Sequence, residues 1–228
     1  MNVLPPPVIS VDGPSGVGKG LVTRWLAGRL GYHRLDSGAL YRILALAAHR
    51  RDVDLHDSAA LARLAPALGI RFAGSTEDDE AILVDGEDWT HDIRKESTGA
   101  LASLIAVQPA VRDALLQRQR DFREAPGLIA DGRDMGTIVF PDACVKIFMD
   151  ASPDERAQRR LKQLSAKGIE AKIAPLREEI RARDERDRNR PIAPLRPADG
   201  AEVVDTTGLS PADVLAKVEL LVQRSGLV

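Results

Sequence analysis

The chain has 228 residues, of which 44% are hydrophobic, and a formal net charge of −2 at pH 7. This length and composition predict one globular domain with room for an inserted subdomain, and the small net charge gives no overall indication of binding to nucleic acid or to an anionic membrane. No stretch approaches the ~20 apolar residues that span a bilayer, and the N-terminus lacks the pattern of a signal peptide. The single cysteine, Cys144, cannot form an internal disulfide, and we expect it to be a small buried side chain. A cytoplasmic monomer without nucleic-acid or membrane partners is therefore expected.

A glycine-rich loop follows the first predicted strand. Residues 8–11 are rich in β-branched side chains and predict a buried strand, whereas apolar residues at helical spacing after Lys19 predict a helix that Gly31 closes. Between them, residues 13–19 have the spacing G-x-x-x-x-G-K of a phosphate-binding loop. The strand–loop–helix context favours nucleotide binding over an ordinary glycine-rich turn. Backbone N–H groups and the helix N-terminus can bind phosphate oxygens there, and Lys19 can reach the β- and γ-phosphates.

The residues after this motif are unusual. The common pattern has Ser or Thr directly after the lysine, with its hydroxyl on Mg²⁺, but this chain has Gly20 and then Leu21. A GTPase-type switch would need that hydroxyl and a guanine-specifying element, and the sequence indicates neither. The residues alone leave a chance glycine run, an impaired nucleotide site and another class of phosphate-transfer enzyme as alternatives.

The next segment predicts a capped helix. Asp36 or Ser37 can cap it, and Arg42 lies within its first turns, close to the free N–H groups. An anion would be held well there, and a surface helix with a solvated arginine fits the segment equally well. Residues 57–98 then predict a small β-rich insertion: a short helix that ends near Gly69, followed by strands at 70–74 and from residue 81, with a turn at residues 85–86.

The second half of the chain alternates helices and strands. A helix over residues 98–107 carries Ser103, and Pro109 opens another helix. The strand at 127–130 stops at the charged stretch DGRDMGT, and the strand at 145–149 ends at Asp150; open α/β sheets place ligands at such carboxyl ends. A final strand at 202–204 and a helix at 211–224 complete the pattern. The sequence therefore predicts an α/β fold, a parallel sheet with helices on both faces.

Two arginine-rich helices precede the final strand. They are marked by Arg156, Arg159 and Arg160 at i, i+3 and i+4, and by Arg183, Asp187 and Arg190 at i, i+4 and i+7 on one face of one helix. A solvated helix with many ion pairs is the usual explanation of such patterns.

Four stretches far apart in the sequence indicate one family. They are DGPSGVGKG from residue 12, LDSGALYR from residue 35, GLIADGRDMGTIVFPDA from residue 127 and RDERDRNRPIAPL from residue 183. Over nearly its full length the chain resembles the bacterial cytidylate kinases, a family of nucleoside-monophosphate kinases. The resemblance implies a single P-loop domain over residues 1–228, with a three-layer α/β fold, a nucleotide-side insertion at residues 57–98 and a helical lid at residues 153–190. It also implies that ATP donates its γ-phosphoryl group to CMP or dCMP.

The resemblance implies a role for each matching residue. ATP is expected on Gly13, Pro14, Ser15, Gly16, Val17, Gly18, Lys19, Gly20 and Leu21. The phosphate of CMP is expected on Ser37, Arg42 and Arg133. Its base is expected on Ser103, Arg112, Asp134 and Arg190, and its ribose on Asp187. The transferred phosphoryl group is expected to lie among the cationic residues Lys19, Arg133, Arg156, Arg160 and Arg183.

The chain departs from the family at one position. Members usually have G-K-G-T, so Gly20 is normal, but Leu21 replaces the threonine. The loop's backbone donors and Lys19 are unaffected, whereas Thr23 lies on another face of the helix and is a poor substitute. A nucleotide-binding protein with weak or no turnover is therefore the alternative function. Mg²⁺ is expected to enter with ATP. It would contact Asp131 or Asp134 through water molecules and have no direct protein ligand.

Overall fold

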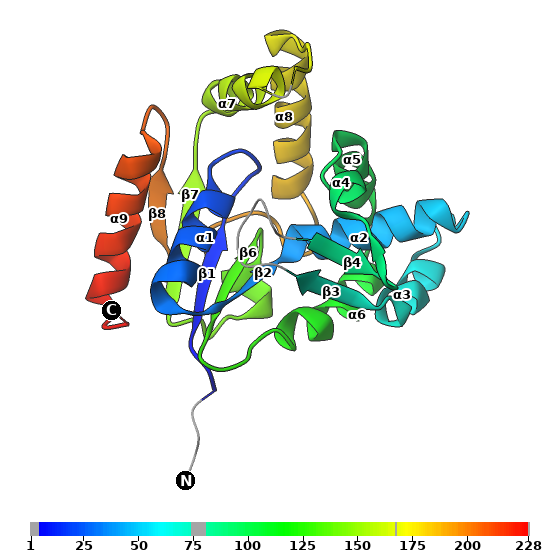
Figure 1. The fold of residues 1–228 in the computed structure, drawn as a ribbon, viewed down its shortest axis with the longest axis horizontal. Coiled ribbons are helices and arrows are strands. Elements are labelled where there is room, and N and C mark those ends of the chain that lie inside the picture. Colours follow the sequence, from blue (N-terminus) through cyan, green and yellow to red (C-terminus); the bar gives the residue numbers. More distant parts are fainter. Residues whose placement is uncertain (1–4, 74–80, 167, 228) are drawn as a thin grey trace. The chain divides into compact units, whose positions relative to one another are not determined.

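The computed structural model describes residues 5–73, 81–166 and 168–227. The chain forms two compact units: the segments up to Leu35 and from Arg123 onward make the first, and Asp36–Phe122 makes the second. The first unit contains a five-stranded sheet and the second a three-stranded sheet (Figure 1).

The sheet of the first unit has the strand order β2-β6-β1-β7-β8. Its strands are β1 (Val8–Asp12), β2 (His33–Asp36), β6 (Leu128–Gly132), β7 (Val145–Asp150) and β8 (Glu202–Asp205). β1 pairs in parallel with β6 and β7, and β7 pairs in parallel with β8. Every residue of β1 is buried, as expected for a central parallel strand covered on both faces. The predicted α/β fold with a parallel sheet is confirmed.

Helices follow the strands of the first unit along the chain. They are α1 (Lys19–Leu30), a short π-helix η1 (Met135–Val139), α7 (Pro153–Ala166), α8 (Ile173–Arg188) and α9 (Pro211–Arg224). Val22 of α1 and Val218 of α9 are fully buried in one apolar core with Ile9 of β1. Figure 1 shows α7 and α8, which pack against each other, on the side of the sheet where β1 and β7 end. Residues that follow these strands therefore lie on the same side as the two helices.

The second unit joins short helices to an antiparallel sheet in the order β3-β4-β5. Its elements are α2 (Ser37–Arg50), α3 (Ser58–Ala67), β3 (Ile70–Ala73), β4 (Ala81–Val84), β5 (Glu87–Asp88), α4 (Thr90–Ile93), α5 (Glu96–Ile105) and α6 (Pro109–Arg120). Asp85 and Gly86 have φ values of 52° and 89°, and positive φ at both positions is the signature of the tight hairpin turn that the sequence predicted. The predicted strand at 70–74 ends at Ala73, and Gly74 lies outside the described residues.

Several boundaries differ from the prediction. The helix expected at 98–107 is α5, which begins and ends two residues earlier. α8 ends at Arg188, so Arg190 does not share its helical face; Pro191 disfavours helical geometry at the residue before it. Cys144 is exposed rather than buried, and its thiol donates to the carbonyl of Val8 at 3.0 Å.

Within the described ranges, no single helix is long and apolar enough to cross a membrane. The segments Ser97–Ile105 and Pro109–Arg120, bent by 104° at the break between them, reach that length and apolar character only when taken together.

Candidate active site

The glycine loop lies between the end of β1 and the start of α1. Gly13, Gly16 and Gly18 have φ values of +148°, +81° and +99°, which side chains rarely adopt. A Cβ atom on Gly13 would lie 2.1 Å from the carbonyl oxygen of Met149, at the end of β7. The loop therefore passes so close to β7 that only glycine fits at its first position.

Lys19 lies across its own loop. Its Nζ donates to the carbonyl of Pro14 at 2.9 Å and lies 3.8 Å from a carboxylate oxygen of Asp131, on β6. The side chain is only 8% exposed. α1 has no side-chain cap and no acidic residue in its first turn, so its N-terminal N–H groups and Lys19 together favour an anion.

Asp12, the last residue of β1, holds the loop that follows β6. Its two carboxylate oxygens accept hydrogen bonds from the backbone N–H groups of Met135 and Gly136, each at 2.8 Å. Burial raises the pKa of Asp12 to about 7, and the charge of Asp134 adds to that increase, whereas the two N–H donors and Lys19 oppose it. Asp12 is the first residue of the stretch DGPSGVGKG but was not among the predicted site residues.

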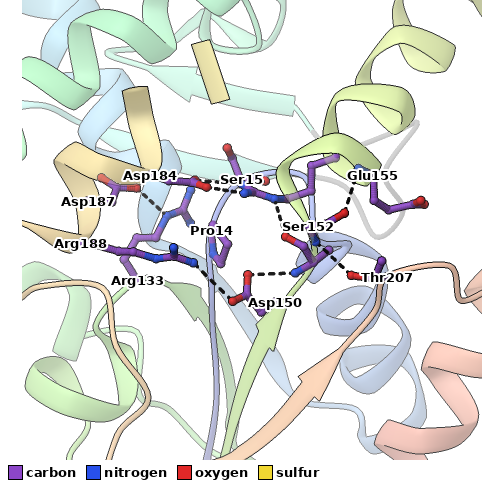
Figure 2. A network of polar contacts seen from close by, with 12 residues as sticks. Pro14, Ser15, Arg133, Asp150, Ser152, Glu155, Asp184, Asp187, Arg188 and Thr207 are labelled. Carbon is purple, nitrogen blue, oxygen red and sulfur yellow. Dashed lines mark hydrogen bonds and ion pairs between the residues drawn. The ribbon is translucent and has the colours of Figure 1, made fainter. Parts of the chain in front are cut away.

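Arg133 and Asp187 are brought together, as Figure 2 shows. Arg133 Nε lies 3.2 Å from a carboxylate oxygen of Asp187 near the end of α8, and one of its terminal nitrogens donates to the carbonyl of Gly132 at 3.1 Å. One helical position further, Arg188 contacts Asp150 at 3.4 Å. The carboxyl ends of β6 and β7 are thus tied to the same end of α8.

The arginines of α7 differ sharply in exposure and partners. The side chain of Arg156 is fully buried and forms a two-pronged ion pair with Asp184 of α8. Its other bonds reach the carbonyls of Ala151 at 3.0 Å and Ser15 at 3.2 Å. The guanidinium group expected to face a transferred phosphoryl group is therefore engaged inside the protein, whereas Arg160 is half-buried and contacts Gln163 on its own helix.

In the second unit, the polar groups around the start of α2 are fixed by neighbouring helices. The hydroxyl of Ser37 donates to the side-chain oxygen of the buried Gln119 at 2.7 Å. Arg42 donates to the carbonyls of Ile93 at 2.9 Å and Lys95 at 3.0 Å. Sequence reasoning did not single out Gln119, which lies 82 residues from its partner and has no signal in the motif.

Arg112 and Ser103 lie on adjacent helices of this unit. Arg112 is 8% exposed, donates to the carbonyl of Ala106 at 3.1 Å, and places its guanidinium carbon 5.8 Å from the ring centre of Tyr41. Ser103 donates to the carbonyl of Gly99, one turn earlier on α5, at 3.1 Å.

The structure thus distributes the predicted site residues over both units. Those in the first unit are residues 13–21 of the loop, Asp131, Arg133, Asp134, Arg156, Arg160, Arg183, Asp187 and Arg190. Those in the second unit are Ser37, Arg42, Ser103 and Arg112. No cluster of three metal-ligating side chains is present in the part of the chain that the structure describes.

Comparison with known proteins identifies the family. A family model described as cytidylate kinase matches residues 9–224, nearly the whole chain. The chain belongs to the cytidylate kinase family. The cytidylate kinase of Aeromonas salmonicida (strain A449) is 57% identical to it over 212 residues, which cover 93% of this chain and 92% of that protein. The cytidylate kinase of Stutzerimonas stutzeri (strain A1501) is 56% identical over 218 residues, 95% of each chain. As a member of the cytidylate kinase family the chain is an ATP-dependent phosphotransferase, and these matches lend no support to a nucleotide-binding protein without turnover.

Proposed function

We propose that the protein transfers the γ-phosphoryl group of ATP to CMP or dCMP and releases CDP or dCDP. The observation that carries this proposal is the family match over residues 9–224, which includes the phosphate loop and the charged stretches that follow β6 and end α8. The single cysteine of the chain suits a reducing cytoplasm, and we propose that the protein acts there as a monomer.

ATP is proposed to bind at residues 13–21. The positive-φ glycines and the uncapped start of α1 suit a polyphosphate, and Lys19 is close enough to its loop to exchange the Pro14 carbonyl for a phosphate oxygen. Mg²⁺ suits this site because it keeps most of its waters and needs only one or two carboxylates beside the phosphates, which Asp131 or Asp134 can supply. When bound, it neutralises phosphate charge.

The acceptor is proposed to bind the residues that the family resemblance assigns to it. Ser37, Arg42 and Arg133 would bind the phosphate of CMP, and Asp187 its ribose. Phosphoryl transfer passes through a loose transition state, so positioning and positive charge provide most of the catalysis and no protein nucleophile is required. Lys19, Arg133, Arg160 and Arg183 would supply that charge, whereas the bonds of Arg156 suggest an indirect role.

Base choice follows from the polar groups proposed around the base. Cytosine offers an exocyclic amino group that suits a carboxylate such as Asp134, and beside it acceptors that suit Ser103, Arg112 and Arg190. Uracil replaces the amino donor with a carbonyl, which would face the carboxylate. Mispaired buried polar groups cost ~1–3 kcal/mol each, so we expect UMP to be a much poorer acceptor than CMP.

A coupled assay that detects ADP tests this proposal, with Mg-ATP as donor and CMP, dCMP, UMP, AMP or GMP as acceptor. Arg112→Met and Arg190→Met should raise the KM for CMP and leave that for ATP nearly unchanged. Arg181→Met, at an exposed arginine of α8, is the matched control and should leave both values unchanged. Equal use of CMP and UMP would contradict the proposed substrate, and ATP binding without ADP production would favour the binding protein.

A further inference from the structure

The phosphate loop is held by side chains that contact its carbonyl groups. Arg156 of α7 donates to the carbonyl of Ser15 at 3.2 Å. Two residues along the loop, the carbonyl of Val17 lies 3.1 Å from the hydroxyl of the buried Thr206, whose single proton it shares with the carbonyl of Asp150 at 3.2 Å, and Arg159 of α7 donates to the same Val17 carbonyl at 3.4 Å. Alternate carbonyls of the loop are therefore bound by α7 and by the residue that follows β8.

These contacts fix the directions of the N–H groups. A carbonyl and the N–H group that follows it belong to one planar trans peptide and point in opposite directions. A Ser15 carbonyl held toward Arg156 therefore turns the Gly16 N–H the other way, and the Val17 carbonyl does the same for the Gly18 N–H. Both glycines have positive φ, the arrangement in which successive N–H groups form an anion-binding concavity.

Arg156 is itself fixed. Its side chain is 0% exposed, both oxygens of Asp184 accept from it, and its Nε donates to the carbonyl of Ala151 at 3.0 Å. A Cβ atom on Gly16 would lie 3.3 Å from the Cβ of Arg156, so the loop backbone lies directly against this side chain. Contact with a transferred phosphoryl group would require breaking a buried ion pair, which leaves an uncompensated charge.

We propose that Arg156, oriented by Asp184, is a positioning residue of the phosphate loop. It acts on the nucleotide through the Ser15 carbonyl and the Gly16 N–H instead of contacting the transferred phosphoryl group. Arg159 and Thr206 have the same function at Val17. This inference rests on the proposed nucleotide site at the loop.

The affinity for ADP separates the two roles of Arg156. A positioning residue shapes donors for phosphates that ADP also carries, so Arg156→Met should weaken ADP and ATP alike. One net hydrogen bond from a charged donor corresponds to an about tenfold change in Kd. A residue that contacts only the transferred group would leave ADP binding unchanged and lower kcat instead.

A second variant removes the effect of lost stability. Arg156→Met alone leaves the buried carboxylate of Asp184 without its partner, whereas Arg156→Met/Asp184→Leu replaces the pair by apolar groups, which commonly restores stability. We expect the double variant to regain the Tm of the wild type while its ADP affinity stays about tenfold weaker. Arg177→Met is the matched control, because Arg177 pairs with Asp154 between the same two helices, where the two side chains are 38% and 53% exposed.

Isothermal titration with ADP and thermal unfolding of each variant complete the test. Thr206→Val keeps the β-branched shape and removes the hydroxyl donor to Val17, so it should weaken ADP severalfold even where both Arg156 variants fold poorly. Wild-type ADP affinity in the double variant, or in Thr206→Val where the double variant does not fold, would overturn the inference. Failure of the wild type to bind ADP would instead overturn the proposed nucleotide site.

Discussion

Asp12 makes the stability of the protein depend on pH in an unusual direction. Its pKa is raised from 3.8 to about 7, chiefly by burial. The folded protein therefore holds a proton that the unfolded chain releases, and the stability contributed by Asp12 is fully present below pH ~4 and lost as the pH rises through ~7. Integrating this difference gives a loss of roughly 2.5 kcal/mol between pH 5 and pH 8.

Asp12→Asn isolates this contribution. The amide keeps one acceptor oxygen for Met135 or Gly136 and loses the other, which lowers the free energy of unfolding by ~1–3 kcal/mol at low pH. The amide at position 12 does not ionise between pH 5 and pH 8. The free energy of unfolding of the variant should therefore approach or exceed that of the wild type as the pH rises. Urea unfolding at pH 5, 6, 7 and 8 measures both free energies.

A matched control separates Asp12 from the exposed carboxylates. The hydroxyl of Thr207 lowers the pKa of Asp205, so the stability that Asp205 contributes is lost only as the pH falls through the acid range. Asp205→Asn should therefore differ from the wild type by a constant amount between pH 5 and pH 8. A constant difference for Asp12→Asn as well would refute the reasoning, since the two N–H donors and Lys19 would then keep the carboxylate ionised.

Three further predictions concern turnover. Lys19→Met preserves the volume of a nearly buried side chain, so the protein should stay folded by circular dichroism while kcat in the coupled assay falls at least ~100-fold. Leu21→Thr should lower the KM for Mg-ATP or raise kcat about tenfold if the missing hydroxyl matters, and no gain in a stable variant would show that the site works without it. Gly99→Ala places a Cβ atom 2.7 Å from a terminal nitrogen of Arg42 and should raise the KM for CMP, with that for ATP unchanged; an unaltered KM would count against phosphate binding by Arg42.

Elements with strong local signals could be predicted from the sequence. α9 begins at Pro211 and ends at Arg224 as predicted, because Ser210 and Asp213 form a reciprocal cap at its start. The buried run of β1 and the left-handed Gly31 after α1 were also read correctly. In each case the residues that determine the boundary lie within a few positions of it.

Features that depend on distant partners could not be predicted. β2 has four residues, of which only Leu35 is buried, so its pattern is too short to indicate a strand. The π-helix η1 is held by Asp12, 123 residues from the N–H that it binds. The spacing of the arginines on α7 likewise gave no sign that Arg156, among several, pairs with Asp184 and is buried.

The shape of the phosphate loop depends little on residue 21. Gly13 lies against β7, the carbonyls of Ser15 and Val17 are bound by α7 and Thr206, and the Leu21 N–H donates to the Gly18 carbonyl at 3.1 Å through its backbone. None of these contacts uses the side chain that replaces the usual threonine. The exchange for leucine therefore leaves the directions of the anion-binding N–H groups intact. Any functional deficit caused by Leu21 should then lie in the hydration and placement of Mg²⁺, and it should weaken Mg-ATP more than metal-free ADP.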